Sequence, residues 1–313
     1  MTPRLIAVDL DGTLIGPDGQ VSNRNLAAVN RAHLAGIEVV VATGRRHSYA
    51  MHVLRALDLP PDNALISSNG TVTRTIGARL LHRTLLSNQT ARWLCLHVDV
   101  FRNSLVMTFD KVGPDGEDTR GALVVEHLED LTASIGRWMT ANEPYIARVS
   151  RLEDALEGSE PPIQMMLCGT VERMRRAEAR LLEHPGVSPG DMAGSARAKP
   201  EVTLHRTEYP ERNLSIVDIL PAGCSKASAL LRLARQRGIA AQDILAIGDN
   251  WNDVPMLEIA GRAVLMGNAP EDLRTVAAGK SWTIGRRHDE DGVAEAIEAA
   301  LETIPISTLS VTR

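Results

Sequence analysis

The sequence has few cysteines and no excess of basic residues. Its three cysteines, Cys95, Cys168 and Cys224, lie far apart and lack the paired spacing of a metal site, so we expect reduced thiols in a cytoplasmic protein. The formal net charge is −5, which argues against a nucleic-acid polymer as partner. Small phosphorylated ligands remain compatible with this charge, because they need only a local cluster of hydrogen-bond donors.

Long apolar runs are also missing. No stretch approaches the roughly 20 apolar residues that a membrane span needs. The apolar segment 5–10 is too short for a signal peptide and is interrupted by Asp9. These absences predict no membrane partner and exclude the membrane pumps that form an aspartyl phosphate. The composition is 44% hydrophobic and 23% charged, as in an ordinary globular protein, and 313 residues favour two domains at about 100–200 residues each.

Strand and helix patterns alternate over the first 70 residues. We expect strands at 5–8, 37–42 and 64–67, and helices from Ser22 or Asn23 to about Ala35 and over 47–57. The run 37–42 (IEVVVA) is continuously apolar, which is typical of a strand buried on both faces of a parallel sheet. This order of elements predicts an α/β protein with a doubly wound parallel sheet.

The alternation is interrupted and then resumes. Between the two parts of the chain that alternate, we expect strands at 106–109, 123–127 and 164–168 and an amphipathic helix at 171–182. We interpret this middle region as an inserted α/β domain. The later pattern predicts strands at 244–247 and 263–266 and helices at 226–237, 254–259, 271–277 and 292–301. We therefore predict a discontinuous core of residues 1–83 and 219–313, an inserted domain of residues 84–218, and a mobile tail after Ile304.

Polar side chains follow three of the predicted strands. The residues concerned are Asp9 and Asp11 after the first strand, Thr43, Gly44 and Arg45 after the second, and Asp249, Asn252 and Asp253 after 244–247. Lys226 begins a helix between these segments. Because ligands of open parallel sheets bind outside the carboxyl ends of the strands, we expect all of these groups to converge on one edge.

These residue types suit phosphoryl transfer. Carboxylates brought together from two strand ends repel each other, and a bound Mg²⁺ would relieve that repulsion. Asp9 could attack phosphorus and form an aspartyl phosphate, and Asp11 could protonate the leaving oxygen and then activate water. The two side chains would point the same way if the extended backbone continued through Asp11. 

The remaining groups of this set could hold the phosphate. Lys226 would balance its charge as a point cation. The Thr43 hydroxyl and backbone N–H groups near Leu10 and Gly44 would bind its oxygens. Phosphoryl transfer depends mostly on such positioning and electrostatics.

At these residues the sequence resembles the haloacid dehalogenase-like phosphatase superfamily. Residues 9–14 (DLDGTL) match its first motif, and 42–45 (ATGR) its second. Lys226 within GCSK matches the third motif, and 248–253 (GDNWND) the fourth. Residues 266–269 (MGNA) and 291–293 (DGV) are similar to the Cof-type subfamily, in which a large α/β cap is inserted between motifs two and three.

The resemblance implies a role for each matching residue. Asp9 would be the nucleophile and Asp11 the general acid/base. Asp9, Asp249 and the backbone carbonyl of Asp11 would hold Mg²⁺. The phosphoryl group would be held by Thr43, Lys226 and Asn252, and Asp253 would orient Lys226 or a metal-bound water. The roles of two further residues stay undecided at this point. Asn69 is either a turn residue or part of the site, and Arg45 either contacts the substrate or pairs with a local acid.

The sequence therefore predicts a cytoplasmic phosphatase acting on a small phosphomonoester, such as a sugar phosphate, a nucleotide or a phosphorylated cofactor. One alternative is a phosphotransferase or phosphomutase on the same scaffold, which would pass the phosphoryl group to a second hydroxyl. The other is a ligand-binding regulator without catalysis. A regulator of that kind should lack one of the key acids, and this chain keeps them all, from Asp9 to Asp253.

Overall fold

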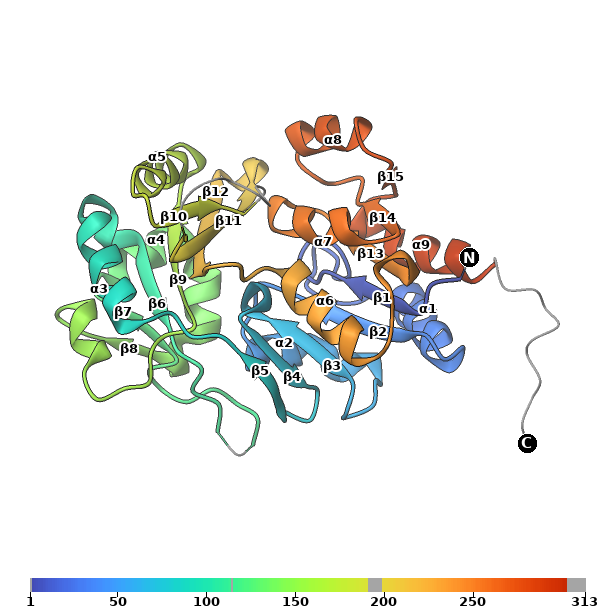
Figure 1. Cartoon of the computed structure of the whole chain (residues 1–313), viewed down its shortest axis with the longest axis horizontal. Helices are drawn as coiled ribbons and strands as arrows, with labels where there is room; N and C mark the ends of the chain where they lie inside the picture. The colour runs from blue at the N-terminus through green and yellow to red at the C-terminus, as the bar shows by residue number, and fades with distance from the viewer. Residues whose placement is uncertain (1, 114, 191–198, 303–313) are drawn as a thin grey trace.

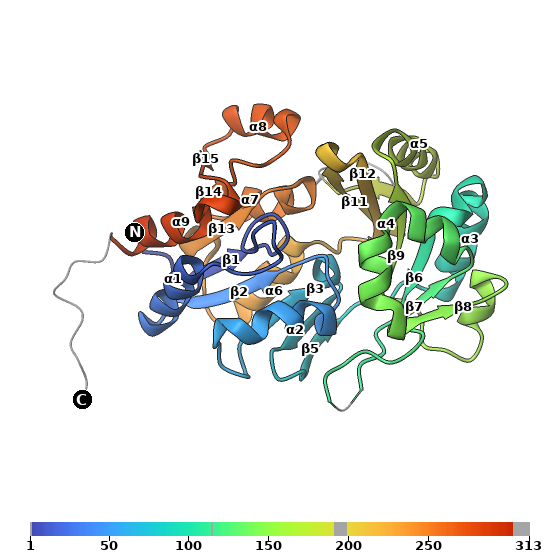
Figure 2. The same ribbon diagram turned by 180° about the vertical axis from the view of Figure 1, so that it is seen from behind.

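A computed structural model describes residues 2–113, 115–190 and 199–302, and it contains two β-sheets that lie beside each other (Figures 1 and 2). The strands of the first sheet are β1 (Leu5–Val8), β2 (Glu38–Ala42), β3 (Ala64–Ser67), β4 (Val72–Thr75), β5 (Leu80–Arg83), β13 (Ile244–Gly248), β14 (Arg262–Leu265) and β15 (Thr283–Ile284). Their order is β15-β14-β13-β1-β2-β3-β4-β5. The strands from β15 to β3 are parallel, and β4 and β5 add an antiparallel edge.

Helices cover both faces of the first sheet. They are α1 (Asn23–Leu34), α2 (His47–Leu54), α6 (Lys226–Gln236), α7 (Val254–Ile259), α8 (Glu271–Ala278) and α9 (Gly292–Leu301). Helices α1, α2 and α9 pack on the face that contains Val8, whereas α6, α7 and α8 pack on the face that contains Ala7. Figure 1 shows α6 in front of the sheet, and Figure 2 shows α1 and α2 in front. Burial on both faces explains the continuous apolar runs and confirms the doubly wound α/β prediction.

The second sheet is inserted between β5 and α6. Its strands are β6 (Leu105–Thr108), β7 (Leu123–Val125), β8 (Ile146–Arg148), β9 (Gln164–Gly169), β10 (Val187–Pro189), β11 (Val202–Tyr209) and β12 (Leu214–Pro221), in the order β10-β11-β12-β9-β6-β7-β8. Its helices are α3 (Asn88–His97), α4 (Leu128–Asn142) and α5 (Val171–Leu182). Helices α3 and α5 pack on one face with Leu167, and α4 packs on the other with Met166.

Short 3₁₀ helices occupy several connections. They lie at Arg55–Leu57, Ser68–Gly70, Asp99–Ser104, Glu143–Tyr145, Leu152–Leu156, Pro210–Arg212, Ala241–Asp243, Trp251–Asp253 and His288–Glu290. The segment 47–57, which was predicted as one helix, consists of α2 followed by the 3₁₀ helix Arg55–Leu57. No helix in the described part of the chain is both long and apolar enough to cross a membrane. The three cysteines are buried free thiols.

The domain boundaries stay a prediction. Strand β5 ends at Arg83, where the predicted inserted domain begins, and β12 continues to Pro221, beyond the predicted boundary after Asp218. Strands β11 and β12 are not apparent in the sequence, because their buried faces carry polar residues such as Thr207 and Asp218 that break the apolar pattern. The predicted mobile tail after Ile304 lies outside the described residues.

Candidate active site

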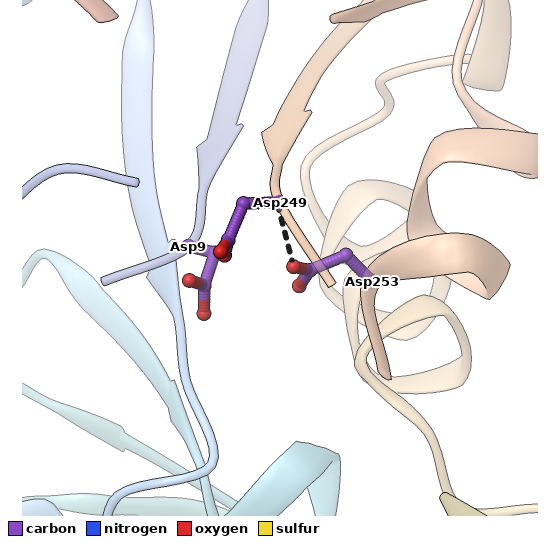
Figure 3. A group of neighbouring side chains, drawn as sticks. All are labelled: Asp9, Asp249 and Asp253. Carbon is purple, nitrogen blue, oxygen red and sulfur yellow. Dashed lines mark hydrogen bonds between the residues drawn. The ribbon is translucent and has the colours of Figure 1, made fainter. Parts of the chain in front are cut away.

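Three buried carboxylates meet at the carboxyl ends of β1 and β13. These strands are parallel neighbours with Val8 opposite Ile247, so Asp9 and Asp249 leave the sheet side by side. The backbone N–H of Asp9 still donates to the carbonyl of Ile247 at 2.9 Å. Ligand oxygens of Asp9, Asp249 and Asp253 all lie within 4.8 Å of one another (Figure 3). Such a set of hard oxygen donors fits a divalent cation of the Mg²⁺ type.

Backbone geometry fixes the positions of Asp249 and Asp253. Asp253 Oδ2 accepts the backbone N–H groups of Asp249 at 3.0 Å and Asn250 at 3.1 Å. Asp249 Oδ1 accepts the Thr13 hydroxyl at 3.1 Å. Gly12 has φ +80°, and a Cβ there would lie 2.4 Å from Asp249 Oδ2. A side chain at residue 12 would therefore displace the carboxylate, which explains the glycine between the first motif's acids and Thr13.

Burial dominates the electrostatics of this cluster. It raises the pKa of Asp9 to about 7, with the Asp253 charge adding to the effect and Lys226 opposing it. Burial, followed by the charges of Asp9 and Asp253, raises the pKa of Asp249 well above its ordinary value. Full ionisation of Asp9, Asp249 and Asp253 would thus place more negative charge here than the single cation Lys226 neutralises. This imbalance is what a bound cation would correct.

Lys226 is the cation that the chain itself supplies. It begins α6, where Ser225 and Ser228 form a reciprocal capping box with two bonds of 3.0 Å. Its Nζ donates to Asp9 Oδ1 at 2.5 Å and to Asp253 Oδ1 at 2.6 Å, and its side chain is fully buried. Burial alone would lower the pKa of Lys226, but the charges of Asp253 and Asp9 outweigh it and raise that pKa. Lys226 therefore stays charged and fixes one oxygen of Asp9.

Asp11 lies in a turn rather than in an extended strand. Strand β1 ends at Val8, and the N–H of Leu14 donates to the carbonyl of Leu10 at 3.1 Å, so the extended backbone does not continue through Asp11. Arg45 donates to both Asp11 oxygens, with Nε at 2.7 Å and Nη2 at 2.5 Å. The guanidinium also lies 4.5 Å from the Tyr49 ring centroid. Arg45 thus pairs with a local acid and lines the same cavity as Asp11.

The predicted phosphate-binding residues are only partly brought together. Gly44 and Asn252 line the cavity beside Asp9, whereas Leu10 and Thr43 are buried and are not among its lining residues. The Thr43 hydroxyl accepts the backbone N–H of Arg45 at 3.1 Å, so it shapes the turn after β2. The binding roles of these residues stay predictions.

A chain of side chains links the fourth motif to the second sheet. Asn252 Nδ2 donates to Asn69 Oδ1 at 3.1 Å, and Asn69 Nδ2 donates to Asp218 Oδ2 at 2.9 Å. Asn69 has φ +51°, a left-handed conformation that asparagine tolerates. Burial raises the pKa of Asp218 to about 7, although Lys226 opposes this shift. Asn69 therefore lies in the turn after β3 and connects two residues that line the cavity, Asn252 and Asp218. Asp218 was not predicted from the sequence.

The cavity has a volume of about 570 Å³ and is lined by residues of both sheets. The loops of the first sheet contribute Asp9, Asp11 and Asp249, and the second sheet contributes the opposite wall, which includes Asp218. Tyr209, at the end of β11, lines the cavity on that wall. Burial and the charges of Asp11 and Asp249 raise its pKa well above the ordinary value, so its hydroxyl stays protonated and able to donate. No motif in the sequence pointed to Tyr209.

A buried ion pair joins the two parts of the molecule beside the cavity. Arg46, which precedes α2, donates through Nε to Asp118 Oδ2 at 2.7 Å and through Nη2 to Asn142 Oδ1 at 2.9 Å. The Ser48 hydroxyl donates to the same Asp118 oxygen. The side chains of Arg46 and Asp118 are 6% and 2% exposed. This pair holds the loop before β7 and the end of α4 against the first sheet.

Replacing Asp118 with Asn should destabilise the protein by about 3–5 kcal/mol, because it leaves the Arg46 guanidinium buried without a counter-ion. The measurement is the free energy of unfolding in urea. Glu117→Gln is the matched control, since Glu117 pairs with a largely exposed Arg55, and such pairs contribute about 0–1 kcal/mol. Equal losses in the two variants would contradict the importance of the buried pair.

Comparison with known proteins identifies relatives of the whole chain. A family model described as haloacid dehalogenase-like hydrolase matches residues 6–297. The 5-amino-6-(5-phospho-D-ribitylamino)uracil phosphatase YwtE of Bacillus subtilis (strain 168) is 30% identical, with 95% of this chain and 98% of its own length covered. Phosphatase YwpJ of the same organism is 31% identical, with 95% and 100% covered. The HMP-PP phosphatase of Enterobacter sp. (strain 638) is 28% identical, with 86% of each chain covered.

Solved structures give the same result. A haloacid dehalogenase-like hydrolase from B. subtilis has a TM-score of 0.71 and 27% identity, covering 94% of this chain and 99% of that one. A second, from Bacteroides thetaiotaomicron, has a TM-score of 0.69 at 24% identity, covering 95% and 99%, and shows the likeness of fold. The resemblance inferred from the four sequence motifs is confirmed.

Proposed function

The chain belongs to the haloacid dehalogenase-like hydrolases, and we propose on that basis that it is a Mg²⁺-dependent phosphatase that forms an aspartyl phosphate on Asp9. The observation that carries the proposal is the buried Asp9 carboxylate, which lines the cavity while Lys226 holds one of its oxygens. A carboxylate fixed in this way can direct its other oxygen at phosphorus. The relatives YwtE and YwpJ are named phosphatases, which are enzymes that hydrolyse phosphoric monoesters.

Asp9, Asp249 and the backbone carbonyl of Asp11 are the groups that we propose to hold Mg²⁺. When bound, the ion would neutralise carboxylate charge and the charge of the phosphoryl oxygens. The proximity of the buried acids and the raised pKa values of Asp9 and Asp249 support a cation in this place. Gly44, Thr43, Lys226 and Asn252 would then position the phosphoryl group, with Lys226 held in place by Asp253.

The reaction follows from these positions. Asp9 attacks phosphorus, the bond from phosphorus to the ester oxygen breaks, and Asp11 gives a proton to the leaving oxygen. Asp11 then takes a proton from water, which attacks phosphorus, releases phosphate and regenerates Asp9. Arg45 donates to both oxygens of Asp11, and a proton on either oxygen would lie beside the guanidinium, so movement of Arg45 away from Asp11 would ease each proton transfer. A phosphoryl group in the cavity would offer the guanidinium an alternative anion.

The substrate that we propose is a small phosphomonoester: a sugar phosphate, a nucleotide or a phosphorylated cofactor. A cavity of about 570 Å³ suits a small metabolite and is too small for a polymer. The names of relatives give a phosphoribitylaminouracil and HMP-PP as substrates, both of which are small phosphorylated compounds. The second sheet would act as the cap that sets specificity. Three free thiols support a reducing compartment such as the cytoplasm.

Removal of divalent metal should lower phosphate release from p-nitrophenyl phosphate by at least about 100-fold, because a metal supplies several kcal/mol of charge stabilisation. The assay compares enzyme dialysed against EDTA with the same enzyme after addition of MgCl₂ or of NaCl. Mg²⁺ should restore activity, and sodium should not. Asp249→Asn should raise the Mg²⁺ concentration needed for half-maximal activity. Full activity of the dialysed enzyme would refute the metal requirement.

A second measurement separates hydrolysis from transfer. Free phosphate should account for all of the ester consumed, even when an acceptor sugar is present in excess. A shortfall matched by a newly phosphorylated sugar would instead establish the phosphotransferase alternative. Absence of any metal-dependent hydrolysis would favour the non-catalytic regulator.

A further inference from the structure

Two polar side chains lie in the cavity wall formed by the second sheet. Thr108 on β6 and Gln164 on β9 are directly opposite each other in adjacent antiparallel strands, and both line the cavity. Thr108 is completely buried, and Gln164 is 3% exposed. Thr108 Oγ1 and Gln164 Oε1 have no hydrogen-bond partner among the described residues. Buried polar groups are nearly always paired, so two unpaired oxygens side by side in a cavity wall indicate a ligand that pairs with them.

The side chains that line the cavity next to this pair on β7, β9 and α4 are apolar. Leu123 lies opposite Thr108 on β7, and Met166 follows Gln164 on the same face of β9. Ile135 and Trp138 of α4 also line the cavity. Among the described residues, β6, β7 and α4 contribute no charged side chain to the lining. On β12, Asp218 lies opposite Met166 and also lines the cavity, so this part of the wall offers apolar contact around two hydrogen-bonding atoms, with one carboxyl group beside it.

We propose that Thr108 and Gln164 bind the leaving group of the substrate, and that this group is a nitrogen heterocycle with an N–H or amino donor at its edge. The proposal rests on the proposed phosphatase function and narrows its substrate class. Gln164 Oε1 can only accept a hydrogen bond, whereas the Thr108 hydroxyl can accept or donate. The ligand must therefore present at least one donor, and a ring edge with a donor beside an acceptor satisfies both oxygens.

The apolar wall favours a ring over a polyol. A ring buries its faces against Leu123, Met166 and Trp138 without leaving polar atoms unpaired. A sugar or sugar alcohol carries several hydroxyls, and most of them would face these apolar side chains without partners. An ordered water between the two oxygens is the competing explanation, and it predicts a structural role for them rather than a role in recognition.

The first test compares phosphate release from defined probes by the wild-type enzyme with Mg²⁺. The probes are uridine 5′-monophosphate, adenosine 5′-monophosphate, glucose 6-phosphate, sorbitol 6-phosphate and p-nitrophenyl phosphate. The best ring probe with an N–H or amino group should exceed the best polyol probe at least about tenfold in kcat/KM. A polyol phosphate as the best substrate would overturn the inference and leave the phosphatase function standing. No release from any probe would instead contradict the proposed function itself.

The second test removes the hydrogen bonds one at a time. Thr108→Val and Gln164→Met keep the shape of each side chain. The readout is the ratio of kcat/KM for the best ring probe to that for its N-methylated form, which lacks the donor. The wild-type ratio should be about 5 to 150, and each variant should bring it towards one. A ratio near one in the wild-type enzyme, or an unchanged ratio in both variants, would contradict recognition by this pair.

Thr73→Val is the matched control. Thr73 is also buried with an unpaired hydroxyl, but it lies on β4 and does not line the cavity, so this variant should keep the wild-type ratio. Thermal unfolding distinguishes the water explanation. Removal of an unpaired polar atom should leave Thr108→Val and Gln164→Met at least as stable as the wild type. A loss of Tm in both variants with no change in the ratio would establish the structural role instead.

Discussion

Asp9→Asn is expected to lower kcat for phosphate release by a factor on the order of 10⁴ or more. The neutral amide is a poor nucleophile and cannot form the acyl phosphate on which the proposed reaction depends. The fold should survive the change. Burial and the nearby charges of Asp253 already oppose the ionised form of Asp9, and Asp253 keeps its own bond to Lys226. We therefore expect the Tm of this variant to equal or exceed that of the wild type without metal.

The measurement is steady-state phosphate release with saturating Mg²⁺, together with thermal unfolding of the same preparation. Asp62→Asn, at an exposed turn, is the control for the substitution itself and should behave as wild type. Near-normal activity of Asp9→Asn would eliminate Asp9 as the nucleophile. Loss of activity accompanied by loss of the fold would also contradict the prediction, because it would assign Asp9 a structural role.

Lys226→Met should have the second large effect, and it should act on stability and activity together. The lysine is fully buried between Asp9 and Asp253, so its removal leaves two adjacent carboxylates without their cation. Removal of one partner of a buried ion pair lowers the free energy of unfolding by about 3–5 kcal/mol. Activity should fall by at least about 100-fold, because Asp9 loses the contact that orients it and the phosphate loses a compensating charge.

A double variant tests the cause of that instability. If repulsion between the carboxylates is responsible, Asp9→Asn should raise the free energy of unfolding more in Lys226→Met than it does in the wild type. Urea unfolding of the single and double variants supplies the cycle. Lys280→Met serves as the control, since Lys280 pairs with Glu258 in a far more exposed place. Purely additive changes in the free energy of unfolding across the cycle would show that the lysine acts through packing rather than through charge.

Much of the catalytic edge could be predicted from the sequence. The apolar runs that became β1, β2 and β13 each end in polar motif residues, and parallel neighbours necessarily end at one edge of a sheet. Asp9 and Asp249 are therefore adjacent for a topological reason. Lys226 could be placed because it begins α6, the α-helix that leads into β13, and Asp249 directly follows that strand.

The other residues of the site depend on contacts that no local pattern encodes. Arg45 can pair with Asp11 because the chain turns after Val8. Asp218 can accept a hydrogen bond from Asn69 because β12 lies beside the first sheet. Thr108 and Gln164 become neighbours through antiparallel pairing across a long stretch of chain. The fold class and the reactive edge follow from local patterns in the sequence, since buried runs and the residues at strand ends are local properties. The residues that face this edge depend on the tertiary structure, because the register of distant strands sets the cavity wall.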